Sequence, residues 1–254
     1  MRREAALSSR WGAEAVVFDV DGLLIDSSAA WEAAFWQTAA RLGGQLSASQ
    51  VRRLAGLSVA SAALQIAQWV GAASQFARAA KVLGDSLAAI VAAEPPTAMP
   101  GARALVGTLA GRLPLGVASN GPGDVVRAML DRAGLLAAFD LVVTADDAAS
   151  KPAPDIYRLA CAGLGARTDR ALALEDSAVG AAAALAAGLR TVLGGPGLAG
   201  AAADRASVAA LHRLCLNAPV ASCPQVCGDL EDPVIFRLLG GVARGRLCEL
   251  RVHP

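Results

Sequence analysis

Histidine and aromatic residues are scarce in this chain of 254 residues. It has two histidines, and aromatic side chains make up 4% of the sequence. His212 and His253 both lie near the C-terminus, so residues 1–200 cannot form a Ser-His-Asp or Cys-His site. Any nucleophilic or acid–base chemistry in this part of the chain must therefore depend on carboxylates.

Charge is also sparse and nearly balanced. Charged residues make up 18% of the chain, the formal net charge is +1, and no basic stripe is present, so we expect no nucleic-acid partner. Residues 1–11 lack the apolar core of a signal peptide, and the apolar run at 177–189 is too short to span a bilayer. We therefore expect a cytoplasmic protein that is a monomer and has no membrane partner.

Apolar residues, in contrast, are abundant. A hydrophobic content of 55% is sufficient for a large core. Apolar runs predict strands near residues 15–20, 115–118, 141–144, 171–175 and 190–193. Helical patterns predict helices near residues 102–111, 124–133, 154–164 and 178–187. The alternation of strands with helices indicates an α/β fold with a parallel, doubly wound sheet.

The helical pattern of residues 27–93 predicts a second unit, inserted into the α/β core. Proline and glycine residues within 94–101 predict the hinge at which the chain returns to the core. The predicted core therefore comprises residues 1–26 and 94–200. Residues 201–254 form a C-terminal tail whose role the sequence does not indicate.

Four of the five cysteines lie in this tail. Cys215, Cys223 and Cys227, together with His212, could bind zinc, although their spacing matches no recognised zinc motif. We favour the alternative, which is reduced thiols without a structural role.

The first apolar run, which begins at Val16, ends in two aspartates two residues apart, Asp19 and Asp21. Beyond the last hydrogen bond of a strand the backbone can curl, so Asp19 and Asp21 can converge on one point at the strand's carboxyl end. Two like charges held together favour a bound cation. Taken alone, the pattern could also be a strand followed by an Asp-Gly turn.

Three later segments place polar groups at the same kind of position. Ser119 and Asn120 follow a predicted strand and precede a helix, where backbone N–H groups form an anion site. Lys151 lies at the entrance to the next helix and could neutralise a bound phosphate. Glu175 and Asp176 follow another strand and offer hard oxygen ligands that suit Mg²⁺. Open parallel sheets bind ligands at the carboxyl ends of their strands, so we expect these groups to meet there.

Each of these segments also has a simpler explanation. Ser119 and Asn120 could cap a helix, and Lys151 could be a solvated charge. Glu175 and Asp176 could form an ordinary helix N-terminus. Their shared place at strand ends and helix entrances favours a functional site.

In this order, the four motifs resemble those of the haloacid dehalogenase superfamily, in its branch of small sugar phosphatases and β-phosphoglucomutases. The resemblance extends over about residues 14–200. It implies a Rossmann-like parallel sheet with a helical cap inserted after the first motif. It also implies phosphoryl transfer from a small phosphorylated metabolite through an aspartyl-phosphate, with Mg²⁺ as cofactor.

Together, the residues and the resemblance predict a role for each motif. Asp19 would be the nucleophile, and Asp21 the general acid and later the general base. By resemblance, Mg²⁺ would bind Asp19, the backbone carbonyl of Asp21, Asp176 and, directly or through water, Glu175. The transferring phosphoryl group would be held by Ser119, Asn120 and Lys151.

We expect a Mg²⁺-dependent phosphatase acting on sugar or polyol phosphates, and other members of the superfamily remain alternatives. Trp31 stands where β-phosphoglucomutases have a cap-hinge histidine, and Ser58 and Val59 lie near the place of their cap arginine, which weighs against a mutase. A tryptophan after Asp26 and Ser27 instead resembles hexose and hexitol phosphate phosphatases. A non-catalytic phospho-ligand-binding relative would need neither a nucleophile nor a general acid, and a hydrolytic dehalogenase would not need the Mg²⁺ carboxylates.

The predicted cap offers few groups that could select a substrate. Its basic residues are expected to form solvated helix surfaces rather than ligand contacts. They include Arg52, Arg53, Arg78 and Lys81. Trp31 and Trp36 could contact a sugar ring, but their spacing more simply fits a helix stripe that faces the core.

Overall fold

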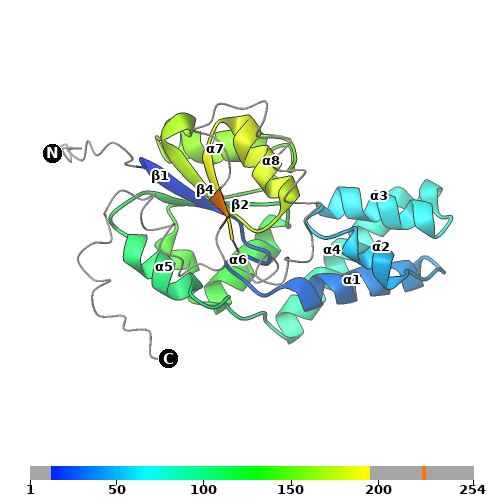
Figure 1. Ribbon diagram of the computed structural model, residues 1–254. Helices are drawn as coiled ribbons and strands as arrows, with labels where there is room; N and C mark the ends of the chain where they lie inside the picture. Colours follow the sequence, from blue (N-terminus) through cyan, green and yellow to red (C-terminus); the bar gives the residue numbers. More distant parts are fainter. Residues whose placement is uncertain (1–12, 195–224, 227–254) are drawn as a thin grey trace.

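A computed structural model describes residues 13–194 and 225–226 of the chain, and its centre is a parallel sheet of six strands (Figure 1). In chain order, the strands are β1 (Ala15–Phe18), β2 (Leu115–Ser119), β3 (Leu141–Thr144), β4 (Ala171–Glu175), β5 (Arg190–Leu193) and β6 (Gln225–Val226). Their order across the sheet is β3-β2-β1-β4-β5-β6. The strand β1 therefore lies between β2 and β4, as in open sheets whose ligand site is at the central strands.

The strand register aligns the residues on which the predicted site depends. Phe18, the last residue of β1, pairs with Val117 of β2 and Leu174 of β4. The backbone N–H of Asp19 donates to the carbonyl of Leu174 at 2.9 Å, so Asp19 lies beside the end of β4. The carboxyl ends of the three strands thus form one edge.

Four helices cover the two faces of the sheet: α5 (Ala102–Leu109), α6 (Gly123–Arg132), α7 (Asp155–Gly163) and α8 (Ala178–Ala187). Successive side chains of a strand point to opposite faces. Accordingly, Val16 and Phe18 share a core with Met129 of α6, whereas Val17 packs with Ile156 of α7 and Ala184 of α8. Both faces are buried, which explains why the strands are apolar throughout.

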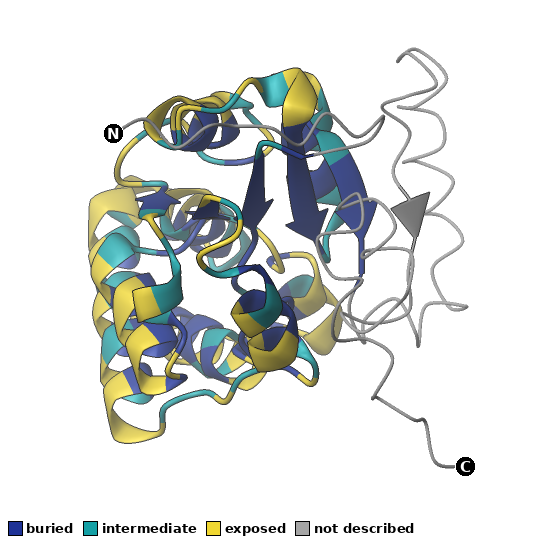
Figure 2. Cartoon of the chain, turned by 90° about the vertical axis from the view of Figure 1, so that its left-hand side faces the viewer, coloured by how far each residue is buried: buried dark blue, intermediate teal, exposed yellow. Residues whose placement is uncertain are grey.

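The helical cap follows β1 and consists of α1 (Ser28–Arg41), α2 (Ala48–Arg52), α3 (Val59–Trp69) and α4 (Phe76–Ala93). The helix α4 packs against both α1 and α3, and buried residues line their inner faces while exposed residues lie outside (Figure 2). Ser47 and Ser58 cap α2 and α3 with their side chains. Three short 3₁₀ helices, Ala73–Gln75, Leu136–Ala138 and Thr168–Arg170, complete the described helices.

Two segments connect the cap to the core, and they are hydrogen-bonded to each other. The backbone N–H of Asp26 donates to Thr97, and that of Met99 donates to Leu24, both at 2.9 Å. The predicted return hinge at 94–101 therefore lies beside the outgoing chain.

The structure confirms the predicted α/β fold with a parallel sheet and an inserted helical cap. The predicted domain boundaries stay a prediction. β6 was not predicted, because two residues are too few for a periodic signal. His212, Cys215, Cys223 and Cys227, the possible zinc ligands, lie outside the described residues. Among the described helices, none is long and apolar enough to cross a membrane.

Candidate active site

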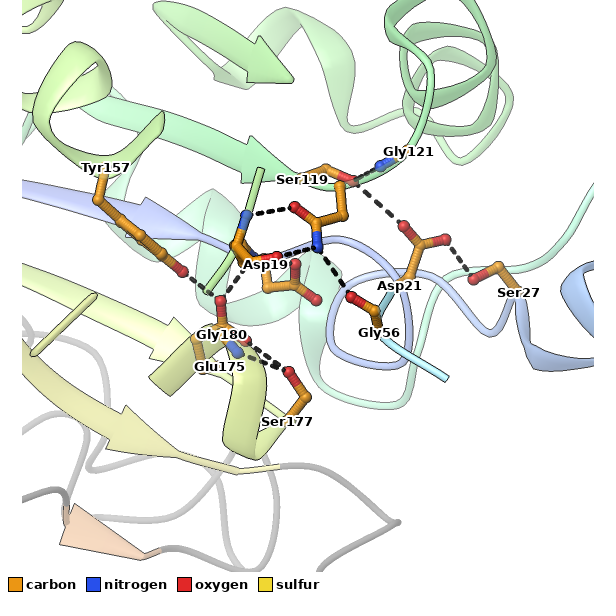
Figure 3. Close-up of polar contacts among 12 residues, drawn as sticks. Asp19, Asp21, Ser27, Gly56, Ser119, Gly121, Tyr157, Glu175, Ser177 and Gly180 are labelled. Carbon is orange, nitrogen blue, oxygen red and sulfur yellow. Dashed lines mark hydrogen bonds and ion pairs between the residues drawn. The ribbon is translucent and has the colours of Figure 1, made fainter. Parts of the chain in front are cut away.

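Polar side chains from three strand ends and one loop meet at the carboxyl edge of the sheet. Asp19 follows β1, Ser119 ends β2 and Glu175 ends β4, while Lys151 comes from the loop between β3 and α7. Figure 3 shows Glu175 and Tyr157 on one side of Asp19, and Ser119 and Asp21 on the other. Segments far apart in the sequence thus build one cluster.

Lys151 is the cation at the centre of this cluster. Its ammonium group lies 2.5 Å from Asp19 Oδ1 and 2.5 Å from Glu175 Oε1, and its side chain is 3% exposed. The backbone around it is held by Asn120, whose Oδ1 accepts the Lys151 N–H at 2.8 Å. A buried charge in this position must be paired, and here two carboxylates pair with it.

Tyr157 of α7 supports the same arrangement. Its hydroxyl donates a hydrogen bond to Glu175 Oε1, the same oxygen that accepts a hydrogen bond from Lys151. The ammonium group of Lys151 also lies 5.2 Å from the centre of the Tyr157 ring. The hydroxyl is buried, and burial followed by the charge of Glu175 raises its pKa well above the ordinary value. Tyr157 therefore stays protonated and acts as a hydrogen-bond donor to Glu175.

The cluster contains more negative charge than Lys151 can balance. Burial raises the pKa of Asp19 to about 8; Lys151 opposes this shift, whereas Glu175 and Asp21 add to it. Burial also raises the pKa of Asp176, and the charges of Asp19 and Glu175 act in the same direction. For Lys151, burial would lower the pKa, but the two carboxylates outweigh it and raise it.

Three of these carboxylates are arranged as a cation site would require. Oxygen atoms of Asp19, Glu175 and Asp176 lie within 4.8 Å of one another. An all-oxygen donor set with excess negative charge fits a hard divalent cation, a class that includes Mg²⁺. The residues present therefore fit the metal that the sequence motifs imply.

Two glycines make room for these carboxylates. At Gly22, where φ is +85°, a Cβ atom would overlap the carboxylate of Asp176. At Gly180, in the first turn of α8, a Cβ atom would overlap the carboxylate of Glu175. The loop after β1 and the helix after β4 can approach the cluster this closely only because neither residue has a side chain.

Asp21 lies beside this cluster, and its carboxylate accepts three hydrogen bonds. Oδ1 accepts the hydroxyl of Ser27 at 2.6 Å and the indole N–H of Trp31 at 2.7 Å. Oδ2 accepts the hydroxyl of Ser119 at 3.2 Å. The predicted acid is therefore held from the cap side and from the core side.

Ser119 and Asn120 make their side-chain hydrogen bonds within the protein. The Ser119 hydroxyl also accepts the N–H of Gly121 at 3.0 Å. The amide nitrogen of Asn120 donates to the carbonyls of Lys151, at 3.1 Å, and of Gly56, at 2.8 Å. Since Gly56 lies between α2 and α3, Asn120 links the core to the cap. Binding of a phosphoryl group by these two residues stays a prediction.

Four basic residues of the cap, Arg52, Arg53, Arg78 and Lys81, are all exposed, as predicted. Arg53 lies over the ring of Trp69, and Lys81 pairs with Asp85. Trp36 is 39% exposed, so its predicted place in a core-facing stripe is wrong. Trp31 is half-buried and donates to Asp21, a contact that neither sequence-based alternative included.

A family model of haloacid dehalogenase-like hydrolases matches residues 13–188. The chain belongs to this family. Its sequence is 35% identical to phosphoglycolate phosphatase from Rhodospirillum rubrum over 195 residues, which cover 71% of this chain and 78% of that protein. It is 31% identical to hexitol phosphatase B from Escherichia coli over 185 residues, covering 70% and 82% of the two chains.

Further matches agree with this assignment. A match to validoxylamine A 7'-phosphate phosphatase from Streptomyces hygroscopicus has 39% identity over 79 residues, but it spans only 37% of that protein and 31% of this chain. The structure of CbbY from Rhodobacter sphaeroides in complex with phosphate superposes with a TM-score of 0.63 at 31% identity, covering 72% of this chain and 86% of that one. These comparisons support the predicted class of enzyme, a phosphoric monoester hydrolase.

Proposed function

We propose that this protein is a Mg²⁺-dependent phosphatase that hydrolyses small phosphorylated metabolites, namely sugar or polyol phosphates, through an aspartyl-phosphate intermediate. The observation that carries this proposal is the buried ion pair of Asp19 with Lys151, next to Glu175 and Asp176. The names of the relatives, among them a hexitol phosphatase and a phosphoglycolate phosphatase, support this class of substrate.

Asp19 would act as the nucleophile. Lys151 holds its Oδ1, and we assign the attack on phosphorus to the other oxygen, Oδ2. The bond from Asp19 to phosphorus forms while the bond from phosphorus to the substrate oxygen breaks. Lys151 offsets negative charge on both reacting partners, which is the main electrostatic requirement of this step.

Asp21 would move the protons of the two half-reactions. It donates a proton to the leaving oxygen of the substrate when the aspartyl-phosphate forms. It then accepts a proton from the water that attacks phosphorus, which releases inorganic phosphate and restores Asp19. A single carboxyl group can serve both steps because the first leaves it in the ionised form that the second needs.

The metal would be held by Asp19, the backbone carbonyl of Asp21, Asp176 and Glu175. When bound, Mg²⁺ supplies positive charge that offsets the excess of carboxylates and of phosphoryl oxygens. Glu175 would also keep Lys151 in place, because its Oε1 accepts hydrogen bonds from both Lys151 and Tyr157. Ser119, Asn120 and Lys151 would surround the transferring phosphoryl group.

The test is phosphate release by the purified protein from glucose 6-phosphate, sorbitol 6-phosphate and phosphoglycolate. We expect turnover with Mg²⁺, inhibition by Ca²⁺, and no turnover after removal of metal with EDTA. Asp19→Asn should lower kcat by several orders of magnitude while the circular dichroism stays normal, because the attacking oxygen is lost. The matched control, Asp131→Asn, changes an exposed aspartate of α6 and should leave kcat unchanged.

Two outcomes would reject the proposal. Asp19→Asn protein that keeps a tenth of the wild-type activity would exclude Asp19 as the nucleophile. Phosphorus NMR of β-glucose 1-phosphate with a bisphosphate primer tests the mutase alternative. Faster accumulation of glucose 6-phosphate than of free phosphate would replace the phosphatase with a mutase.

A further inference from the structure

We propose that Trp31 is a positioning residue for Asp21. The indole N–H of Trp31 and the hydroxyl of Ser27 both donate to Asp21 Oδ1, at 2.7 and 2.6 Å. Trp31 lies in the first turn of α1, the first helix of the cap, and Ser27 immediately precedes this helix. The inference rests on the proposed function, because it assigns Trp31 a role only through the acid–base chemistry of Asp21.

The hydrogen bonds divide the two carboxyl oxygens of Asp21 into different environments. Oδ1 is occupied by the two donors from the cap side. Oδ2 faces Ser119 at the end of β2, with a longer contact of 3.2 Å. Trp31 and Ser27 therefore fix the rotation of the carboxyl group and leave Oδ2 to exchange a proton with the substrate oxygen.

Trp31 is well placed to hold this orientation. Its ring lies against Phe35, one turn further along α1, with centroids 5.7 Å apart, and Phe35 is buried in the core of the cap. A Trp side chain has two rotatable torsions, and packing of this ring restricts both. Because the catalytic gain from a general acid depends on geometry, fixing the carboxyl group should matter to rate more than to substrate binding.

The leaving group of the substrate separates this role from ordinary packing. A sugar or polyol oxygen leaves as an alkoxide and needs a proton, whereas p-nitrophenolate leaves readily without one. Trp31→Phe keeps an aromatic ring but removes the N–H donor. We expect it to lower kcat/KM about 10- to 100-fold for the alkyl phosphate that turns over best among the three test substrates, and less than about threefold for p-nitrophenyl phosphate.

Trp36→Phe is the matched control, since Trp36 lies on the same helix and is 39% exposed. It should change neither value. Trp31→His retains a ring N–H and should recover part of the lost kcat/KM for the alkyl phosphate. If Trp31→Phe folds poorly, Trp31→Leu, which also lacks an N–H donor, should show the same selective loss for the alkyl phosphate, and Trp31→His should again lose less.

A double-mutant cycle tests whether Trp31 acts through Asp21. In the Asp21→Ala background, Trp31→Phe should cause no further loss of kcat/KM. An additional loss there, or an equal loss for both kinds of substrate in the single variant, would overturn the inference. So would a loss for sugar phosphates that is absent for phosphoglycolate, because it would assign Trp31 to contact with the sugar.

Failure of the inference can be told apart from failure of the proposed function. If Asp21→Ala lowers kcat/KM equally for alkyl and p-nitrophenyl phosphates, Asp21 is not the general acid and the proposed mechanism fails. If Asp21→Ala lowers kcat/KM selectively for alkyl phosphates and the Trp31 variants without an N–H donor do not, only the role of Trp31 is refuted.

Discussion

Lys151→Met removes the buried cation of the cluster while keeping an unbranched side chain in its place. Lys151 pairs with Asp19 and Glu175 at 2.5 Å, and all three side chains are less than a tenth exposed (3%, 9% and 0%). The variant therefore leaves two buried carboxylates without their partner. Because Met fills most of the volume of the lysine stem, the loss is electrostatic and creates no large cavity.

Removing one partner of a buried ion pair costs about 3–5 kcal/mol. For a folded unit of about 150–250 residues, 1 kcal/mol corresponds to about 2–4 °C in Tm. We therefore expect Tm to fall by about 6–20 °C. The cost should be larger at about pH 9.5 than at about pH 6, because wild-type Asp19 ionises near pH 8, whereas loss of the neighbouring positive charge raises the pKa of Asp19 further and the variant keeps losing stability above that pH.

Urea denaturation in EDTA at the two pH values measures this difference. Adding Asp19→Asn to the Lys151→Met protein should recover part of the stability lost at the higher pH, because Asn does not have to take up a proton when the chain folds. A loss of less than 1 kcal/mol that is the same at both pH values would refute our description of Lys151 as the charge that stabilises this cluster.

Three further predictions concern the neighbours of Lys151. Tyr157→Phe should lower the free energy of unfolding by about 1.5–3 kcal/mol, because it removes a hydrogen bond to the buried carboxylate of Glu175. Without metal, the free energy of unfolding should fall as pH rises from 3.8 to about 8, because folded Asp19 holds a proton that the unfolded chain releases. One such group lowers the free energy of unfolding by at most about 1.4 kcal/mol per pH unit. Gly22→Ala should raise the Mg²⁺ concentration needed for half-maximal activity, because its Cβ would displace Asp176.

Each of these predictions has a control or a contrary result. Thr38→Val removes a buried hydroxyl that donates to the neutral carbonyl of Ala34, and should cost only about 0.5–1.5 kcal/mol. Adding Mg²⁺ should stabilise the protein more at pH 8 than at pH 5, and the reverse would contradict the assigned pKa shift. Gly84→Ala, in an open position of α4, should be stabilising by about 0.5–1 kcal/mol.

The order of strands and helices could be predicted from the sequence because it depends on local patterns. The runs that form β1, β2, β3, β4 and β5 are short and mostly apolar, and each of these strands begins and ends within two residues of its predicted place. The positions of Asp19, Ser119 and Glu175 follow from the same pattern, since each lies at a strand's carboxyl end.

What each of these side chains touches depends on the tertiary structure alone. Tyr157 has the spacing of a core residue of α7. The periodicity of the helix shows that this side chain is buried, but not that its hydroxyl donates to Glu175. The hydrogen bond from Asn120 to the carbonyl of Gly56 joins residues 64 positions apart. Because the acceptor is a backbone atom, which every residue has, the amino-acid types do not predict this contact. The spacing of Trp31 and Trp36 assigned both to one core-facing stripe, yet Trp31 donates to Asp21 and Trp36 is 39% exposed.

The sequence by itself thus determined which chemical groups reach the edge of the sheet, because side-chain direction along strands and helices is periodic and local. The tertiary structure decided how those groups pair, because hydrogen bonds and ion pairs form between segments whose separation is set only when the chain packs. Lys151 shows the difference: its charge was evident from the sequence, but its burial between Asp19 and Glu175 results from the packing of the loop after β3 onto the ends of β1 and β4.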